Sequence, residues 1–431
     1  MKKILRLKLK ILARLILKKY KPVVVGITGS IGKTSAKEAV FTVLHNHFSV
    51  RMSLKNYNNE IGLPLTIIGI ESAGRDLFAW LKVFTAARRL MLFKDKNYPK
   101  ILFLEMGVDR PGDMDYLTAI APVSVGLVTG VSYAHLEYFG SINNIKKEKQ
   151  VLIEKIVNPT KGLAILNYDN ELTREMADVS RTRIMTYGLK PGANLQAQDI
   201  VYNLTKSNYE LSGINFKLNY NGAIVPVLMP NVMSATALYA ALAGAALGLY
   251  FEMNLVEIAQ ALHDFVLPPG RMHLLPGVKH TFLIDDTYNS SPEAALAAIE
   301  ILSQMKIDEA SKKYAVLGDM LEIGSYTEEG HRAVGAAVAK QGLNYLVAVG
   351  ERARGFIHGA KEAGLDDNYL FHFDRPEEAG LFLQDRIKAG DVLLIKGSQG
   401  ARMEKIVKEL MAEPERASEL LVRQGQEWEN K

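Results

Sequence analysis

Cysteine does not occur among the 431 residues of this chain. Its absence excludes disulfide bonds, thiolate nucleophiles and metal sites built from thiolates. A chain without cysteine is also compatible with a reducing compartment, and we expect the protein to be cytoplasmic. No run of about 20 apolar residues occurs either, so we expect no segment to span a bilayer.

Acidic residues are absent from the first 21 positions, MKKILRLKLKILARLILKKYK, which hold nine Lys and Arg residues. Subtracting these nine charges from the net charge of +5 leaves −4 for the other 410 residues. Leu and Ile between the cations predict an amphipathic helix. It could lie on the inner face of a membrane, or it could pack on the protein body with its lysines in water. A secretory signal fits poorly, because charges interrupt every apolar run.

Two nucleotide-binding patterns are also missing. The C-terminal part has no Gly-x-Gly-x-x-Gly turn, which argues against a nicotinamide-dependent enzyme. No Asn-Lys-x-Asp motif for a guanine base occurs, and LNYDN (166–170) resembles one only superficially. The chain therefore has the marks of neither a dinucleotide enzyme nor a GTPase.

Short apolar runs followed by helix-like segments recur after residue 22. The first four are PVVVGITG (22–29), ILFLEMG (101–107), SVGLVTGV (124–131) and LAILNYD (163–169). They predict buried strands of a mainly parallel sheet. Helices are predicted at Thr34–His47 and Ile142–Val157, and a buried, alanine-rich helix at 232–250. Residues 196–228 alternate as antiparallel strands do.

A second α/β domain is predicted after FVLPPGRMH (265–273), whose prolines and glycine are typical of a domain junction. Four further strand-and-helix units follow, with strands in FLIDDTYNS (282–290), YAVLGDM (314–320), YLVAVGE (345–351) and DVLLIKGS (391–398). They indicate a doubly wound, Rossmann-like fold. The sequence thus predicts a basic helix at 1–21, an α/β domain with a phosphate-binding loop at 22–268, and an α/β domain at 269–431.

The stretch GITGSIGKTS (26–35) lies between a predicted strand and a predicted helix. A strict phosphate-binding loop has glycine at position 27, where this chain has Ile27. The context still suits phosphate, since glycines let backbone N–H groups close on phosphate oxygens at a helix N-terminus. Lys33 is placed to pair with the β- and γ-phosphates, and the Thr34 hydroxyl to bind magnesium.

Three further residues could serve the same site. Glu105 ends a strand, and ligands gather at the carboxyl ends of strands in α/β sheets. It could therefore reach the same magnesium. His135 follows the strand SVGLVTGV, and Lys149 lies 14 positions further along, in a basic helix. Taken alone, these two are an ordinary loop histidine and an ordinary helix lysine.

Six segments fall in an order that resembles the Mur ligase family, the ATP-dependent amide-forming enzymes of peptidoglycan precursor synthesis. They are NYNNEIGLPLTI (56–67), EMGVDRPGDM (105–114), HLEYFGS (135–141), IDDTYNSSPEA (284–294), VLGDMLEIG (316–324) and KGSQGARME (396–404). The family's loop reads Thr-Gly-x-x-Gly-Lys-Thr/Ser, so Ile27 fits it. The likeness is strongest to the branch that adds D-alanyl-D-alanine to a UDP-muramoyl-tripeptide through an acyl phosphate.

The resemblance implies roles for individual residues. The ATP site would include the loop and three C-terminal residues: Thr28, Gly29, Ser30, Ile31, Gly32, Lys33, Thr34, Arg271, Asp286 and Asn289. Two Mg²⁺ ions would be held by Thr34, Glu105, His135 and a carbamylated Lys149. The same likeness makes Lys33, Glu105, His135 and Lys149 catalytic. Substrates would contact Asn56, Asn58, Asn59, Lys396 and Ser398.

The chain also departs from this family. The resemblance implies an N-terminal domain that grips the UDP part, and here we expect only the 21-residue helix. A lipid-attached substrate, or a partner protein that supplies the missing contacts, would suit that arrangement. Arg110 replaces a common histidine, and Met229-Pro230-Asn231 replaces a Gly-x-His-Asn turn. Two alternatives stay open: a ligase for another acceptor, such as a lipid-linked muropeptide or a polyamino acid, and a membrane-associated nucleotide-binding protein without ligase activity.

Overall fold

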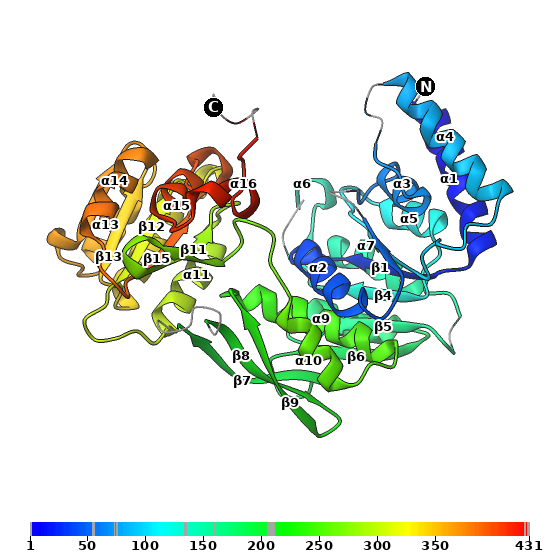
Figure 1. The fold of residues 1–431 in the computed structure, drawn as a ribbon, viewed down its shortest axis with the longest axis horizontal. Coiled ribbons are helices and arrows are strands. Elements are labelled where there is room, and N and C mark those ends of the chain that lie inside the picture. Colours follow the sequence, from blue (N-terminus) through cyan, green and yellow to red (C-terminus); the bar gives the residue numbers. More distant parts are fainter. Residues whose placement is uncertain are drawn as a thin grey trace. The chain divides into compact units, whose positions relative to one another are not determined.

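The computed structural model describes residues 2–53, 57–72, 74, 76–132, 136–158, 160–204, 212–425 and 428. The chain forms two compact units. Unit 1 comprises Met1–Asp199, Lys217–Val227 and Leu238–Phe265, and unit 2 comprises Ile200–Phe216, Leu228–Ala237 and Val266–Lys431. The elements of both are labelled in Figure 1. The two units are defined by the density of contacts within each, which does not test the three predicted domains. The domain bounds therefore stay a prediction.

A nine-stranded sheet forms the centre of unit 1 and continues through the three strands that the unit boundary crosses. Its order is β2 (Val50–Met52), β3 (Ile101–Glu105), β1 (Val23–Thr28), β4 (Val125–Val128), β5 (Leu163–Asn167), β6 (Arg183–Gly188), β7 (Leu195–Asn203), β8 (Gly213–Tyr220) and β9 (Ala223–Pro230). The pairs from β2 to β7 are parallel. The predicted parallel sheet is confirmed.

Strand burial explains why the sequence predicted this sheet. Strands β3, β4 and β5 are buried throughout, as continuous apolar runs require. The segment whose alternation predicted antiparallel strands contains a tight hairpin. Asn221 and Gly222, with φ of 50° and 83°, join β8 directly to β9. Two consecutive residues with positive φ are typical of the Asn-Gly hairpin turn.

The helices of unit 1 cover this sheet. They are α1 (Lys2–Tyr20), α2 (Lys33–Leu44), α3 (Gly62–Ile68), α4 (Leu77–Leu92), α5 (Asp113–Ile120), α6 (Leu136–Phe139), α7 (Ile142–Glu154), α8 (Glu171–Arg174), the 3₁₀ turn η1 (Glu175–Val179), α9 (Ala235–Tyr250) and α10 (Leu255–His263). Helix α1 contacts α3, α4 and α5. Its residues Leu9, Ala13 and Ile16 are fully buried, so one of its faces packs on the body. Within the described part of the chain, none of the helices has the length and apolarity that crossing a bilayer requires.

A six-stranded sheet forms the centre of unit 2. Its order is β10 (His273–Gly277), β11 (Thr281–Asp286), β15 (Val392–Lys396), β12 (Lys313–Gly318), β13 (Tyr345–Val349) and β14 (Leu370–Phe373). Only the β10–β11 pair is antiparallel among the pairs described. Strands β10 and β14 were not predicted. Strand β10 starts at the last residue of the predicted junction, and its Pro276 lies at the sheet edge, where proline is tolerated. Strand β14 has only four residues.

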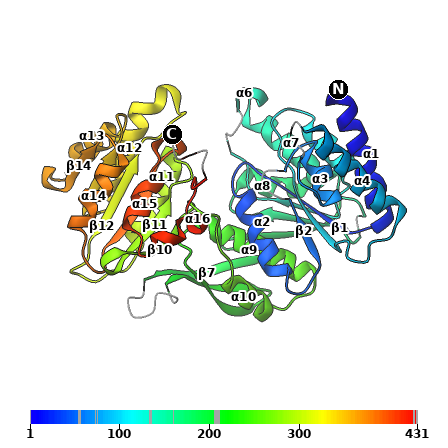
Figure 2. The same cartoon turned by 45° about the horizontal axis from the view of Figure 1, so that its top comes forward.

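The helices of unit 2 form two groups on its sheet. Helix α12 contacts both α11 and α13, α14 contacts α15, and both groups contact strands (Figure 2). The elements are η3 (Val278–His280), α11 (Pro292–Gln304), η4 (Gly324–Tyr326), α12 (Thr327–Lys340), α13 (Arg354–Glu362), η5 (Asp367–Tyr369), α14 (Pro376–Arg386), η6 (Gln399–Ala401), α15 (Glu404–Leu410), η7 (Pro414–Arg416) and α16 (Ala417–Leu420). The predicted doubly wound fold is confirmed.

Candidate active site

The loop between β1 and α2 has the backbone geometry of a phosphate cradle. Gly32 caps α2 with φ of 82°, and Gly29 has φ of 152°. A Cβ atom on Gly29 would lie 2.0 Å from Oγ1 of Thr129, so no other residue fits there without displacing the loop. Thr129 also donates to the Ile31 carbonyl at 2.5 Å. The end of strand β4 therefore holds the loop in shape.

Lys33 and Thr34 open helix α2 and are half-buried. The Nζ atom of Lys33 donates a hydrogen bond to the carbonyl of Gly29 at 2.7 Å. The ammonium thus lies over the loop itself, where phosphate oxygens would arrive. Thr28 is engaged differently, because its hydroxyl donates to the Met106 carbonyl at 2.9 Å and ties β1 to the end of β3.

Glu105 ends β3 directly beside β1, in register with Ile27. Its side chain is buried, and Oε1 accepts a long hydrogen bond of 3.5 Å from Nδ2 of Asn58. Oε2 has no hydrogen-bond partner among the described residues. A buried carboxylate oxygen without a partner is costly, and a hard cation such as Mg²⁺ would satisfy it.

A metal would need ligands beyond this carboxylate. The described residues include no group of three or more His, Asp or Glu side chains that could hold a metal ion. Mg²⁺ commonly takes one or two carboxylates and completes its shell with water and substrate phosphates. Glu105 and the Thr34 hydroxyl fit that pattern. His135 lies outside the described residues, as does Asn56.

Lys149 lies on α7 and is almost fully buried, with 4% of its surface exposed. Burial, followed by the positive charge of Lys33, lowers the pKa of its amine to about 7, against the partial compensation of Glu148 and Asp109. The neighbouring Glu148 is also buried. Its carboxylate accepts from the backbone N–H groups of Gly112 and Met114 at 2.9 and 2.7 Å, which stabilises the first turn of α5. The sequence analysis did not single out Glu148.

The two described asparagines of the NYNNEIG segment differ in role. Asn58 contacts Glu105, and its carbonyl accepts from Gly107 N–H at 2.9 Å. The side chain of Asn59 instead accepts from the N–H groups of Ile61 and Gly62, at the start of α3. The first is thus beside the predicted metal site, and the second holds local backbone.

In unit 2, three of the predicted residues form one cluster. Lys396 ends β15, and its Nζ donates to Oδ2 of Asp286 at 2.7 Å and to the carbonyl of Asn289 at 2.9 Å. The ion pair is buried, with 3% of the lysine side chain and 14% of the aspartate side chain exposed. Asn289 itself is exposed. The cluster fixes the loop after β11 and leaves Asn289 accessible.

Arg271 and Ser398 lie next to that loop. The Arg271 guanidinium lies over the ring of Tyr288, 4.2 Å from its centroid. Ser398 is buried, and its hydroxyl donates to the Ser290 carbonyl at 3.2 Å while accepting from Leu321 N–H at 2.9 Å. The Ser398 side chain therefore already joins three loops.

Two residues that sequence reasoning missed also hold this loop. Asp285 is fully buried and accepts from the Thr287 hydroxyl at 2.6 Å and from Gly270 N–H at 3.1 Å. Burial raises the pKa of its carboxyl to about 6. From the C-terminal segment, the Arg423 guanidinium donates to the Thr287 carbonyl. The Asp-Asp repeat was the available signal for Asp285, whereas nothing near Arg423 indicated this contact.

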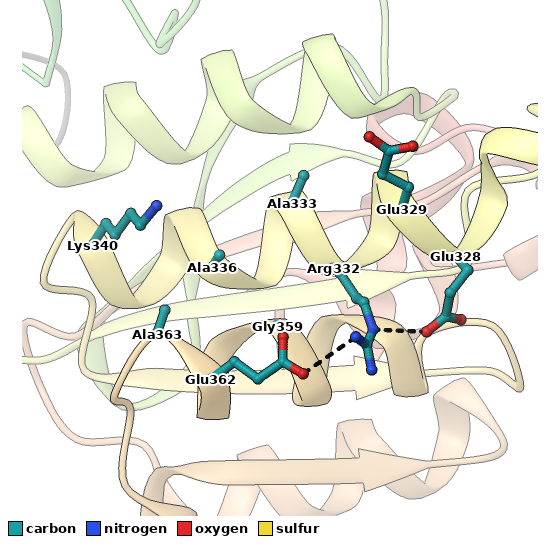
Figure 3. Close-up of a pocket in the computed structure, with 9 residues that line it drawn as sticks. All are labelled: Glu328, Glu329, Arg332, Ala333, Ala336, Lys340, Gly359, Glu362 and Ala363. Atoms are coloured by element: carbon teal, nitrogen blue, oxygen red, sulfur yellow. Dashed lines mark hydrogen bonds and ion pairs between the residues drawn. The ribbon is translucent and has the colours of Figure 1, made fainter.

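Unit 2 also has a shallow hollow on its surface. It runs between α12 and α13, where Arg332 pairs with Glu328 and Glu362 (Figure 3). Alanine and glycine residues line much of the rest. None of the predicted site residues borders it, so we do not assign the reaction to this hollow.

Comparison with known proteins gives two family matches. The model described as Mur ligase middle domain matches residues 85–239, and the one described as Mur ligase, glutamate ligase domain matches residues 270–399. The UDP-N-acetylmuramoyl-tripeptide–D-alanyl-D-alanine ligase of Bacillus subtilis (strain 168) is 28% identical over 91% of this chain and 76% of its own. That of Escherichia coli (strain K12) is 26% identical over 90% and 76%.

Solved structures give the same result. MurF from Thermotoga maritima in complex with ADP matches with a TM-score of 0.72 and 27% identity, over 95% of this chain and 84% of that one. MurF from Acinetobacter baumannii matches with a TM-score of 0.73 and 25% identity, over 93% and 79%.

Proposed function

The chain belongs to the Mur ligase family, and from this premise we propose that it is an ATP-dependent ligase that joins D-alanyl-D-alanine to a muramoyl-tripeptide precursor of peptidoglycan. One observation carries the proposal. Lys33 closes the phosphate loop, and its charge acts on the buried amine of Lys149. At the end of the neighbouring strand β3, the buried Glu105 has a carboxylate oxygen without a partner among the described residues. A plain nucleotide-binding scaffold has no need of such costly buried groups.

The reaction follows from the chemistry of a carboxylate, which is a poor electrophile. The terminal phosphoryl group of ATP is transferred to the peptide carboxylate, giving an acyl phosphate and ADP. The free amine of D-alanyl-D-alanine then attacks the acyl carbon, and the tetrahedral intermediate releases phosphate as the amide forms. Lys33 exchanges its bond to the Gly29 carbonyl for one to a phosphate oxygen, and so stabilises charge on the group in transfer.

Magnesium fits this site on the evidence of Glu105. We propose that Thr34 and Glu105 hold one ion, which supplies positive charge to the phosphate oxygens during transfer. A second ion, held by His135 and Lys149, rests on the resemblance alone. No other part of the proposal depends on it.

Lys149 is proposed to carry a carbamate. Only a neutral amine can attack CO₂, and the pKa of about 7 makes much of this amine neutral near neutral pH. The amine nitrogen bonds to the carbon of CO₂ and releases one proton, which leaves a carboxylate in place of the ammonium. The new negative charge lies near Lys33, so the repulsion between two cations becomes an attraction.

Residues of unit 2 are proposed to hold the nucleoside and the incoming amine. Asp286 and Asn289 would bind ribose and adenine, and Arg271 would reach the phosphates. The pair with Lys396 supports the role of Asp286, because it holds one carboxylate oxygen and fixes the orientation of the other. Lys396 and Ser398 would support the dipeptide site.

The setting of the reaction is a further part of the proposal. We propose that the protein is cytoplasmic and contacts the inner face of the membrane peripherally through residues 1–21. In this segment α1 exposes several apolar side chains. That contact favours a second candidate acceptor, a muropeptide attached to lipid. A partner protein that recognises the UDP part is the alternative to lipid attachment.

The test is phosphate release by the purified chain with ATP, Mg²⁺, D-alanyl-D-alanine and UDP-muramoyl-tripeptide, with the product identified by mass. We expect release to require all four, and the product to gain one dipeptide. Phosphate release with a lipid-linked muropeptide but not with UDP-muramoyl-tripeptide would show that the acceptor is the lipid-linked form. No ATP turnover with either acceptor would reject ligase activity.

A further inference from the structure

Helix α1 has a second apolar face, which the protein body does not cover. Ile4, Leu7, Ile11 and Leu15 recur every three or four residues and are 43% to 62% exposed. This spacing puts them on one side of the helix, opposite the buried residues Leu9, Ala13 and Ile16. A helix that only packs on a protein needs one apolar stripe. The outer stripe therefore needs another explanation.

Helix α4 shows the same arrangement independently. Its residues Val83 and Ala87 are buried, while Phe78, Leu81 and Leu92 are between 61% and 79% exposed. The spacing again places the exposed residues on one side, opposite the buried ones. Sequence reasoning did not identify this helix at all.

The two helices lie side by side (Figure 1) and are fastened to each other. The ammonium of Lys19, in the last turn of α1, donates to the carbonyls of Leu90, Met91 and Phe93 at the end of α4, at 2.8 to 3.0 Å. Both helices contribute their inner faces to the same hydrophobic core. Their outer stripes consequently both point away from that core.

Charge distinguishes this surface from an ordinary exposed patch. Neither α1 nor α4 contains an acidic residue. Exposed cations flank both stripes: Lys8, Arg14 and Lys18 on α1, and Lys82, Arg88 and Arg89 on α4. These six make no ion pair with any acid of the described chain. By contrast, Arg6 of α1 pairs with Glu60 at 2.6 Å, and Lys10 lies over the ring of Tyr116.

We propose that the outer faces of α1 and α4 form one docking surface for an anionic lipid bilayer. Leucine, isoleucine and phenylalanine would enter the boundary between headgroups and acyl chains, and the flanking cations would meet lipid phosphates. Long cationic side chains suit this role, because they bury their stems and keep the charge at the headgroups. The surface extends the contact proposed above for residues 1–21, and it does not depend on the ligase reaction.

Helix α1 itself also approaches the loops of the candidate site. The partner of Arg6 is Glu60, two positions from Asn58, whose side chain donates to Glu105. The early turns of α1 therefore lie near the loops that carry the candidate site. Docking would hold those loops close to the headgroups, where an acceptor attached to lipid is presented.

The experiment is flotation of the full chain with vesicles of phosphatidylglycerol and phosphatidylcholine, against vesicles of phosphatidylcholine alone. We expect binding to the anionic vesicles only, weakened by high salt because salt screens exposed charges. Replacing Lys82, Arg88 and Arg89 by Gln should weaken binding about fivefold per cation. The double variant Leu81→Ser and Leu92→Ser should weaken it at least tenfold.

Leu381→Ser is the matched control, since Leu381 on α14 is 57% exposed and Leu81 is 61% exposed. It should bind as the unmodified chain does. Failure of the full chain to float, or full binding by both α4 variants, would overturn the two-helix surface. Equal binding to vesicles of phosphatidylcholine alone would also overturn it. Phosphate release with a soluble acceptor should be unchanged in every variant, so a failure of the ligase proposal is seen separately.

Discussion

The Nζ atom of Lys33 and the carbonyl oxygen of Gly29 are 2.7 Å apart, so the lysine closes the phosphate loop by bonding to its own backbone. Because this bond is within the loop, a phosphate oxygen that enters the loop can replace the Gly29 carbonyl as the acceptor. We expect Lys33→Met to lower the rate of phosphate release by about 10²–10³-fold, the cost of removing one donor from a charged transition state. Thermal unfolding should change little.

Lys100→Met is the control for that variant, since Lys100 is exposed and lies just before β3. Its rate should match that of the unmodified chain. If Lys33→Met keeps more than a third of the rate, the loop does not hold the transferred phosphate.

Gly29→Ala tests the loop geometry. The added Cβ would meet Thr129 Oγ1 at 2.0 Å and the backbone of Gly130 at 3.2 Å, so overpacking adds to backbone strain. We expect a loss of about 3–5 kcal/mol of unfolding free energy, together with loss of ATP binding. Urea unfolding and nucleotide titration measure the two effects.

Gly342→Ala separates strain from collision. Gly342 has φ of 68°, and a Cβ there would meet nothing within 4 Å. It should cost only about 1–2 kcal/mol. Equal costs for the two alanine variants would mean that Thr129 yields and the loop is not tightly held.

The parallel strands that carry these residues could be predicted from the sequence, and the reason is physical. Parallel strands buried on both faces are continuous apolar runs, and their carboxyl ends are where polar residues such as Glu105 and Lys396 appear. The contacts between loops are different, since Lys396 meets Asp286 across 110 positions. Local patterns carry no information about such pairs. The roles of Glu148, Asp285 and Arg423 were missed for this reason, and β14 because four residues give no clear period.

Lys149→Ala tests the carbamate. The variant should lose phosphate release by at least 10²-fold, and a short carboxylic acid such as acetate should restore part of the activity by replacing the missing carboxylate. Lys147→Ala is the control, because Lys147 is an exposed lysine of the same helix. A Lys149→Ala variant with the unmodified rate would refute the assignment.

The pH dependence of stability tests the burial of the same amine. Unfolded chains protonate lysine below about pH 10.5, whereas burial keeps the folded amine neutral down to about pH 7. Unfolding therefore takes up a proton between these two values, so this group makes stability rise with pH across that window. Below pH 7 the folded chain bears the full cost of the buried charge.

Lys149→Met should remove that contribution. We expect the variant to be more stable than the parent at pH 6, by up to about 5 kcal/mol, and to lose this advantage by pH 10. Urea unfolding in CO₂-free buffer at both pH values measures the difference. A constant difference at all pH values would show that the amine is not buried in its neutral form.

The Asp286–Lys396 pair gives the last prediction. Asp286→Asn leaves the buried ammonium of Lys396 without its counterion, and breaking a buried pair costs about 3–5 kcal/mol. Asp367→Asn breaks a pair of similar length, 2.6 Å, whose side chains are 60% and 68% exposed, and it should cost at most about 1 kcal/mol. In the double variant Asp286→Asn and Lys396→Met no unpaired charge remains, so part of the stability should return. If Asp286→Asn lowers the free energy of urea unfolding no more than Asp367→Asn does, the pair is exposed to water and does not hold the loop after β11.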